Sequence, residues 1–78
     1  MSSHIQAILL SNEYFTEKTA DSWIKRHKYK PIKKVHISPT AYRYRLREPD
    51  EKKYEYRTKR IKPYVKFIIG YPIYNFLI

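Results

Sequence analysis

A strictly alternating segment near the middle of the chain limits the folds that this protein can adopt. In residues 41–48, AYRYRLRE, the apolar or aromatic residues Tyr42, Tyr44 and Leu46 occupy every second position, and arginines fill the positions between them. Successive side chains of a β-strand point to opposite faces of a sheet. The spacing therefore predicts an antiparallel strand with one buried face and one arginine-covered face.

The segment before this strand has the pattern of an amphipathic helix. In residues 17–28, EKTADSWIKRHK, the side chains of Ala20, Trp23 and Ile24 recur with helical spacing and form one apolar stripe. Thr16 precedes the segment and has the side chain of a good N-cap, and a Lys-Pro pair follows it. We expect this helix to pack its stripe on a sheet.

Further segments have the composition of short strands, and they span residues 4–11, 33–38, 54–61 and 64–69. The resulting order, β-α-β-β-β-β, predicts an α+β fold with one helix packed on a small antiparallel sheet. In the first strand we expect Ile5, Ala7 and Leu9 to enter the core. We expect one domain over residues 1–70 and an apolar C-terminal tail over 71–78.

The charge of the chain indicates its partners. The 78 residues include 17 Lys and Arg against seven Asp and Glu, a net charge of +10. Such charge favours nucleic acid, an anionic membrane surface or an acidic protein. We expect no membrane span, because the longest apolar stretch, FIIGYPIYNFLI, is too short and contains Gly70 and Pro72. The chain has no cysteine, which excludes disulfides and thiolate zinc sites.

The arginine-covered face is the first candidate site. If segments 41–48 and 54–61 pair as a hairpin, one register sets the three arginines of 41–48 opposite Lys59, Arg57 and Glu55. Like charges across a sheet repel each other, so we expect an anion to bind there. A slip of one residue would instead set the arginines opposite tyrosines. A solvated outer face that binds nothing is the alternative interpretation.

A second basic segment is KRHKYKPIKK, residues 25–34, in which six of ten positions are Lys or Arg. We expect it to form a basic rim beside the hairpin, although charge at a helix C-terminus also serves the helix dipole and solubility. The residues that we expect to contact phosphate in the two segments are Arg43, Arg45, Arg47, Arg57, Lys59, Arg60, Lys62, Lys25, Arg26, Lys28, Lys30, Lys33 and Lys34.

The remaining chemistry-bearing side chains give weaker signals. Tyrosines such as Tyr54 and Tyr56 stack on bases in some single-strand binders, but strand tyrosines are more often core residues, and we expect Tyr44 to be one. The three histidines are scattered and the acidic residues form no pair that would perturb their ionisation. We therefore expect neither an enzyme nor a bound cofactor or metal.

A series of short motifs covers residues 5–70: AILLS, Phe15-Thr16, Ala20, Trp23-Ile24, HKYK, Arg43-Tyr44-Arg45, Pro49, Tyr56-Arg57-Thr58 and VKFIIG. In this order the motifs resemble those of a small domain widespread in tailed-phage and giant-virus proteins. Leu46 departs from the pattern, because many members have a polar residue there, and the segment 71–78 is an addition.

The short chain and its high basic charge are similar to the small DNA-binding virion proteins of marseillevirus-like giant viruses. This resemblance implies a viral origin, with location in the virion interior and in host cytoplasm or nucleus during infection. The leading hypothesis is non-catalytic, largely sequence-independent DNA binding, with a role in genome packaging or condensation. The alternative is a virion structural or protein-interaction module that self-associates, for example as a homodimer, through residues 71–78. RNA is a third possibility, since phosphate contacts alone do not separate it from DNA.

Overall fold

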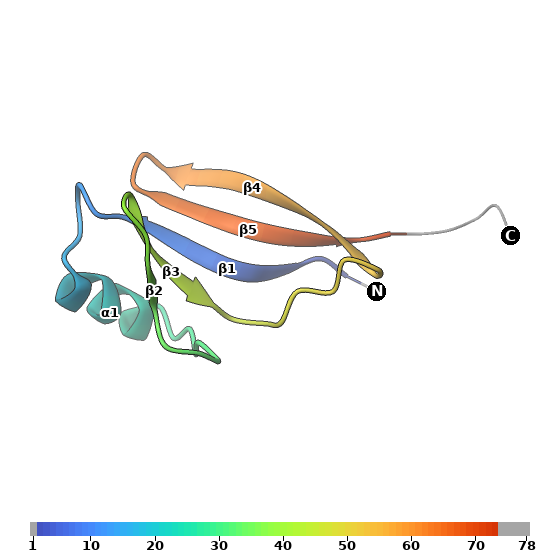
Figure 1. Cartoon of the computed structure of the whole chain (residues 1–78), viewed down its shortest axis with the longest axis horizontal. Coiled ribbons are helices and arrows are strands. Elements are labelled where there is room, and N and C mark those ends of the chain that lie inside the picture. Colours follow the sequence, from blue (N-terminus) through green and yellow to red (C-terminus); the bar gives the residue numbers. More distant parts are fainter. Residues whose placement is uncertain (1, 74–78) are drawn as a thin grey trace, which may run out of the picture.

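The protein folds as a five-stranded antiparallel sheet with one helix on one of its faces (Figure 1). The computed structural model describes residues 2–73. Its elements are β1 (His4–Ser11), α1 (Glu17–Arg26), β2 (His36–Ile37), β3 (Ala41–Arg45), β4 (Tyr54–Lys62) and β5 (Val65–Pro72). The predicted α+β class and the order of its elements are confirmed.

The strands lie in the order β2-β3-β1-β5-β4, so β1 occupies the centre. The expected hairpin between residues 41–48 and 54–61 is wrong, because β1 and β5 lie between β3 and β4. Two connections explain the difference. β4 turns directly into β5 through residues 63–64, whereas residues 46–53 are long enough to carry the chain across the sheet (Figure 1). This arrangement gives the apolar strand β1 a hydrogen-bonded neighbour on each side.

Helix α1 begins where the sequence predicts. The hydroxyl of Thr16 accepts a hydrogen bond from the backbone N–H of Thr19, and the Thr16 N–H donates to the Thr19 hydroxyl at 2.9 Å. This reciprocal pair is a capping box that satisfies free N–H groups of the first turn. The helix ends at Arg26 instead of residue 28, because Lys28 adopts a positive φ of 63° that right-handed helix excludes.

The core lies between α1 and the sheet. Its buried members are Ile8, Leu10, Ala20, Ile24, Tyr44 and Val65. The Tyr44 hydroxyl donates to Asp21 Oδ1 of the helix at 2.5 Å. Burial, together with the hydrogen bond to Asp21, raises the pKa of Tyr44. Tyr44 is therefore a core residue, as predicted, and its hydroxyl ties the helix to β3.

A bulge in β1 changes which residues enter this core. Ile5 lies opposite Ile69 of β5, but Ala7 lies opposite Ile68, so one extra residue interrupts the alternation. Gln6 fills the bulge: its carbonyl accepts from the backbone of residues 46 and 47, and its Nε2 donates to the Arg47 carbonyl at 2.8 Å. After the bulge the core contains Ile8 and Leu10, so the expected core position of Leu9 is wrong.

Several predicted bounds change for related reasons. β3 stops at residue 45 because the backbone N–H groups of the next two residues donate to Gln6 rather than continuing the ladder. β2 is shorter than the expected 33–38. β5 continues past Gly70 to Pro72, and the Ile73 N–H donates to the Lys53 carbonyl, so residues 71–73 belong to the folded domain. Residues 74–78, most of the expected tail, lie outside the described residues, as does self-association through them.

Candidate nucleic-acid interface

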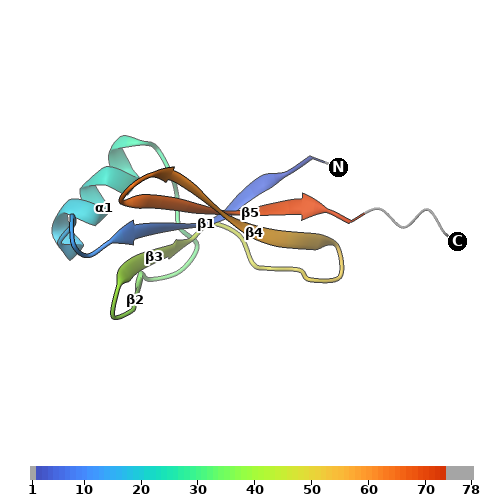
Figure 2. The ribbon, with the colours of Figure 1, turned by 90° about the horizontal axis from the view of Figure 1, so that it is seen from above.

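The sheet face that points away from α1, here called the open face, carries a line of residues that includes three Arg and Lys side chains. Figure 2 shows the helix on one side of the sheet only. Residues directly opposite each other on neighbouring strands share a face, and Leu9, opposite Arg43 and Lys66, lies on the open face. The register extends this line across all the strands, through His36 (β2), Arg43 (β3), Leu9 (β1), Lys66 (β5) and Arg60 (β4). We call these five residues the cationic row.

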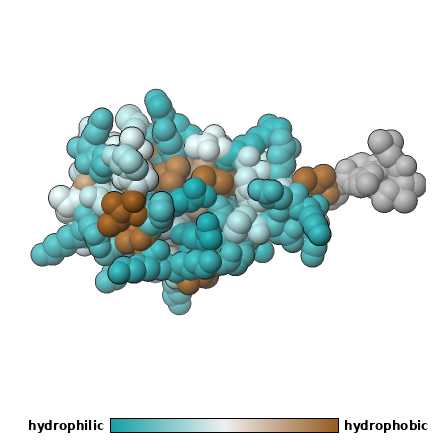
Figure 3. All heavy atoms as spheres, viewed as in Figure 1, coloured by the Kyte–Doolittle hydropathy of each residue, from teal (hydrophilic) through white to brown (hydrophobic). Residues whose placement is uncertain are grey.

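The next positions along the open face form a less charged row. Arg45 lies opposite Ala7, which lies opposite Ile68, which in turn lies opposite Thr58 on β4. The central side chains are apolar and the outer ones are polar. In the view of Figure 3, hydrophilic side chains likewise cover most of the surface, and apolar atoms show in small separate patches. Among the strand residues of the open face, positive charge thus lies at the cationic row and at Arg45.

Acidic side chains are scarce on this face. Within the described strands Glu55 is the only acidic residue, and its position opposite Tyr71, beside Arg57, places it on the helix side. Glu48, in the connection after β3, reaches the rim of the open face: its carboxylate lies 2.9 Å from Lys33 Nζ and 3.7 Å from Arg45 Nη1. The hydrogen bond from Lys33 lowers the pKa of Glu48.

Of the residues predicted from the first basic segment, Arg43, Arg45 and Arg60 lie on the open face. The prediction that Arg57 and Lys59 share a face with these arginines is wrong. Both lie on the helix side of β4, opposite Ile69 and Phe67, and Lys62 lies there too, opposite Val65.

The cause is the choice of partner strand. Because β4 pairs with β5, its register follows from the turn at residues 63–64 and a bulge between Arg60 and Lys62. Arg57 is also neutralised in part by its own strand: Nη2 lies 3.2 Å from Glu55 Oε1, and the guanidinium lies 6.0 Å from the ring centroid of Tyr71. The expected surface of five cations on one hairpin does not exist.

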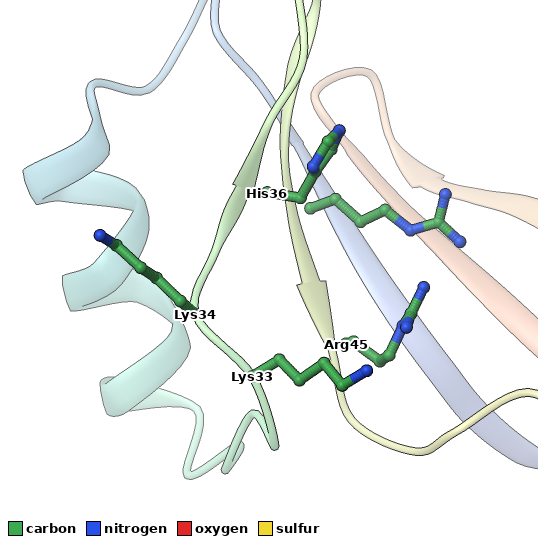
Figure 4. A pocket seen from close by; sticks show the side chains of 5 residues that line it. Lys33, Lys34, His36 and Arg45 are labelled. Atoms are coloured by element: carbon green, nitrogen blue, oxygen red, sulfur yellow. The ribbon is translucent and has the colours of Figure 1, made fainter.

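The expected basic rim is also divided. Lys25 and Arg26 end α1, Lys28 and Lys30 follow it, and Arg47 is exposed beyond the end of β3. Lys33 and Lys34 precede β2 and line a pocket with Arg43 and Arg45. Figure 4 shows Lys33 directed toward Arg45, whereas Lys34 points toward the helix. Lys33 is therefore the rim residue whose side chain reaches the open face beside Arg45.

Sequence reasoning missed Lys66 and His36 as members of the site. Lys66 stands between the core residues Val65 and Phe67, in the segment 64–69 that was predicted only to be a strand. The position of Lys66 between two apolar residues could have identified it, because this alternation indicates a strand with one solvent-exposed face. His36 lies in KKVHIS, where its exposed ring falls opposite Arg43.

The other end of the open face holds an aromatic cluster. The ring of His4 packs edge-on against Tyr54, with centroids 4.5 Å apart, and lies 6.4 Å from Tyr56. Gly70 leaves room for it: a Cβ at Gly70 would lie 2.8 Å from the Tyr56 ring and 2.9 Å from His4 Nε2. The Tyr56 hydroxyl also accepts a hydrogen bond from the Asp50 N–H at 2.6 Å. These tyrosines are packed and half-buried, which argues against their use as free stacking platforms.

We expect His4 to make the stability of the protein fall in acid. Both ring nitrogens of His4 are buried and have no hydrogen-bond partner among the described residues. Burial, and then the charge of Arg47, lower the pKa of His4 below its ordinary 6.5. The unfolded chain therefore binds the proton first, so this contribution to stability is complete above pH 6.5 and is lost as pH falls through the folded pKa.

The measurement is the urea midpoint at pH 7.5 and pH 5.5 for the wild type and His4→Phe. The substitution keeps a ring in the cluster and removes the proton site, so it should flatten the pH dependence. His36→Phe is the control, because His36 is exposed. An equal pH dependence in His4→Phe and the wild type would contradict the assignment.

Comparison with known proteins finds no match to this chain among family models, curated proteins or solved structures. Within residues 2–73, no group of three or more His, Asp or Glu side chains is placed to hold a metal ion. The same residues contain no helix of the length and apolar character needed to cross a membrane.

Proposed function

We propose that the protein binds nucleic acid, with DNA as the preferred form, through phosphate contacts made by the open face of its sheet. The cationic row is the observation that supports this most directly. It sets Arg43, Lys66 and Arg60 on one face without an acidic residue between them along the row. Lys66 and Arg60 are direct cross-strand neighbours. Such a pair is destabilising by itself, and an anion relieves the repulsion.

The dimensions of the row suit a polyphosphate. Neighbouring strands lie about 4.8 Å apart, so a row that crosses five strands is roughly 19 Å long. One strand of duplex DNA rises 3.4 Å per phosphate, and a length of about 19 Å thus faces five or six phosphates. Contacts from charged side chains to phosphate carry no base information, which favours binding that is largely independent of sequence.

The biological role that we propose, genome packaging or condensation in a large DNA virus, depends on the sequence resemblance and the net charge. The binding activity itself does not depend on the viral assignment. A protein that coats DNA without catalysing a reaction needs cations on one surface and no catalytic group. The open face meets the first requirement with Arg43, Arg45, Arg60 and Lys66.

The test is the salt dependence of binding. If Lys33 and the four open-face Arg and Lys residues each neutralise one phosphate, log K for duplex DNA should fall with log salt at a slope of about −4.5. Fluorescence anisotropy with duplex DNA, single-stranded DNA and RNA of equal length measures the slope and the preferred form. Polyglutamate is the control: if the natural partner were an acidic protein, polyglutamate should bind as tightly as DNA. A slope near zero would contradict the proposal.

A further inference from the structure

The pocket between β2 and β3 has a lining of unusual charge. It is formed by Lys33, Lys34, His36, Arg43 and Arg45, so every lining residue is basic. In Figure 4 the side chain of Lys33, from the segment before β2, is directed toward that of Arg45, at the end of β3. The His36 ring lies on the same side as Arg45. A concave surface lined by Arg and Lys side chains is suited to an anion with several oxygen atoms.

A carboxylate of the protein already occupies part of this arrangement. Glu48 places Oε1 2.9 Å from Lys33 Nζ and Oε2 3.7 Å from Arg45 Nη1, one oxygen for each cation. The Lys33 and Glu48 side chains are 56% and 59% exposed. Ion pairs with this exposure contribute little to stability. Glu48 is therefore an occupant that a stronger anion can displace.

Arg43 contributes a donor that Glu48 leaves unused. Its Nε is buried and has no hydrogen-bond partner among the described residues. A buried donor without a partner costs stability, which a rotation of the Arg43 side chain that brings this N–H to an acceptor in the pocket would restore. A carboxylate has two oxygens, which here face Lys33 and Arg45, whereas a phosphate group offers further oxygens for a third donor.

We propose that this pocket binds a single phosphate group through Lys33, Arg43 and Arg45, in competition with the Glu48 carboxylate. The inference deepens the proposed function and rests on it for the carrier of that phosphate, which is a nucleic acid. The ligand is either a phosphodiester within the strand or a terminal phosphomonoester, and both have the same recognition chemistry. Glu48 then acts as an internal competitor that weakens binding until the phosphate replaces it.

The test uses the full chain labelled with ¹⁵N and follows the Arg43 Nε–Hε signal by NMR, assigned with Arg43→Lys. Inorganic phosphate is titrated first at constant ionic strength, with chloride as the control anion. We expect phosphate to shift the Arg43 signal. Glu48→Gln should tighten phosphate binding roughly two- to fivefold, as expected for removal of an exposed ion pair. Glu51→Gln is the matched control, because it removes an equal charge from the same connection.

A short oligonucleotide with and without a 5′-phosphate distinguishes the two carriers. Tighter binding of the phosphorylated form assigns the pocket to a terminal monoester, and an Arg43 shift of equal size with both forms assigns it to the phosphodiester. An unmoved Arg43 signal in phosphate, while DNA still binds with a steep salt slope, would overturn the pocket and leave the proposed function standing. A phosphate-dependent shift with a flat DNA salt slope would keep the pocket and remove the proposed function.

Discussion

Exchange of Arg60 and Lys66 for glutamine should weaken duplex DNA binding about 60-fold at 0.1 M salt. Each phosphate contact contributes a slope of about 0.9 in log K against log salt, or roughly eightfold in affinity at that concentration. Two lost contacts also reduce the magnitude of the slope by about 1.8. Arg60 and Lys66 lie directly opposite each other on β4 and β5, so the double variant removes one end of the cationic row.

The matched control is Arg57→Gln with Lys59→Gln. It removes the same amount of charge, but from the helix side of β4, where Arg57 and Lys59 lie opposite Ile69 and Phe67 of β5. Its affinity loss should be several times smaller than that of the open-face variant. Equal losses would show that net charge, not the open face, carries binding. Circular dichroism of both variants verifies that they fold. Removal of the like-charged cross-strand pair Arg60 and Lys66 should preserve or raise stability.

Ile8→Ala should lower the free energy of unfolding by about 2–5 kcal/mol, the usual cost of truncating a buried aliphatic side chain. Ile8 is 0% exposed and lies between Tyr44 and Phe67 on the neighbouring strands. A domain of 78 residues has a total stability of about 4–12 kcal/mol, so this variant should lose much of its folded population.

Leu9→Ala is the neighbouring comparison, and it tests the bulge at Gln6. Leu9 is half-buried on the open face, so its truncation should cost less than half as much as that of Ile8. Urea denaturation of both variants at pH 7.5 measures the difference. A larger loss for Leu9→Ala would place Leu9 in the core and contradict the bulged register of β1.

Local features of the chain were predictable because their causes lie within a few residues. Thr16 and Thr19 form a cap from side chains three positions apart, and Tyr44 and Arg43 occupy opposite faces because a strand alternates. The sequence predicts that α1 ends at residue 28, two residues after its observed end at Arg26, because no residue pattern indicates that Lys28 has a positive φ.

The candidate site was predictable only in part. Arg43, Arg45 and Arg60 were identified and lie on the open face, but Arg57 and Lys59 were assigned to the same surface and lie on the other side. The pairing of β4 with β5 depends on long-range contacts throughout the sheet. A shift of register by one residue moves every side chain to the opposite face.

From its sequence alone this protein is a basic α+β domain with one capped helix and a strand that separates tyrosines from arginines, because charge, capping and alternation are local properties. The tertiary structure decided the rest. The central place of β1, the bulge at Gln6 and the pairing of β4 with β5 bring Lys66 and His36 into line with Arg43 and Arg60. Residues so distant in the chain meet only through packing and backbone pairing, which short sequence patterns do not encode.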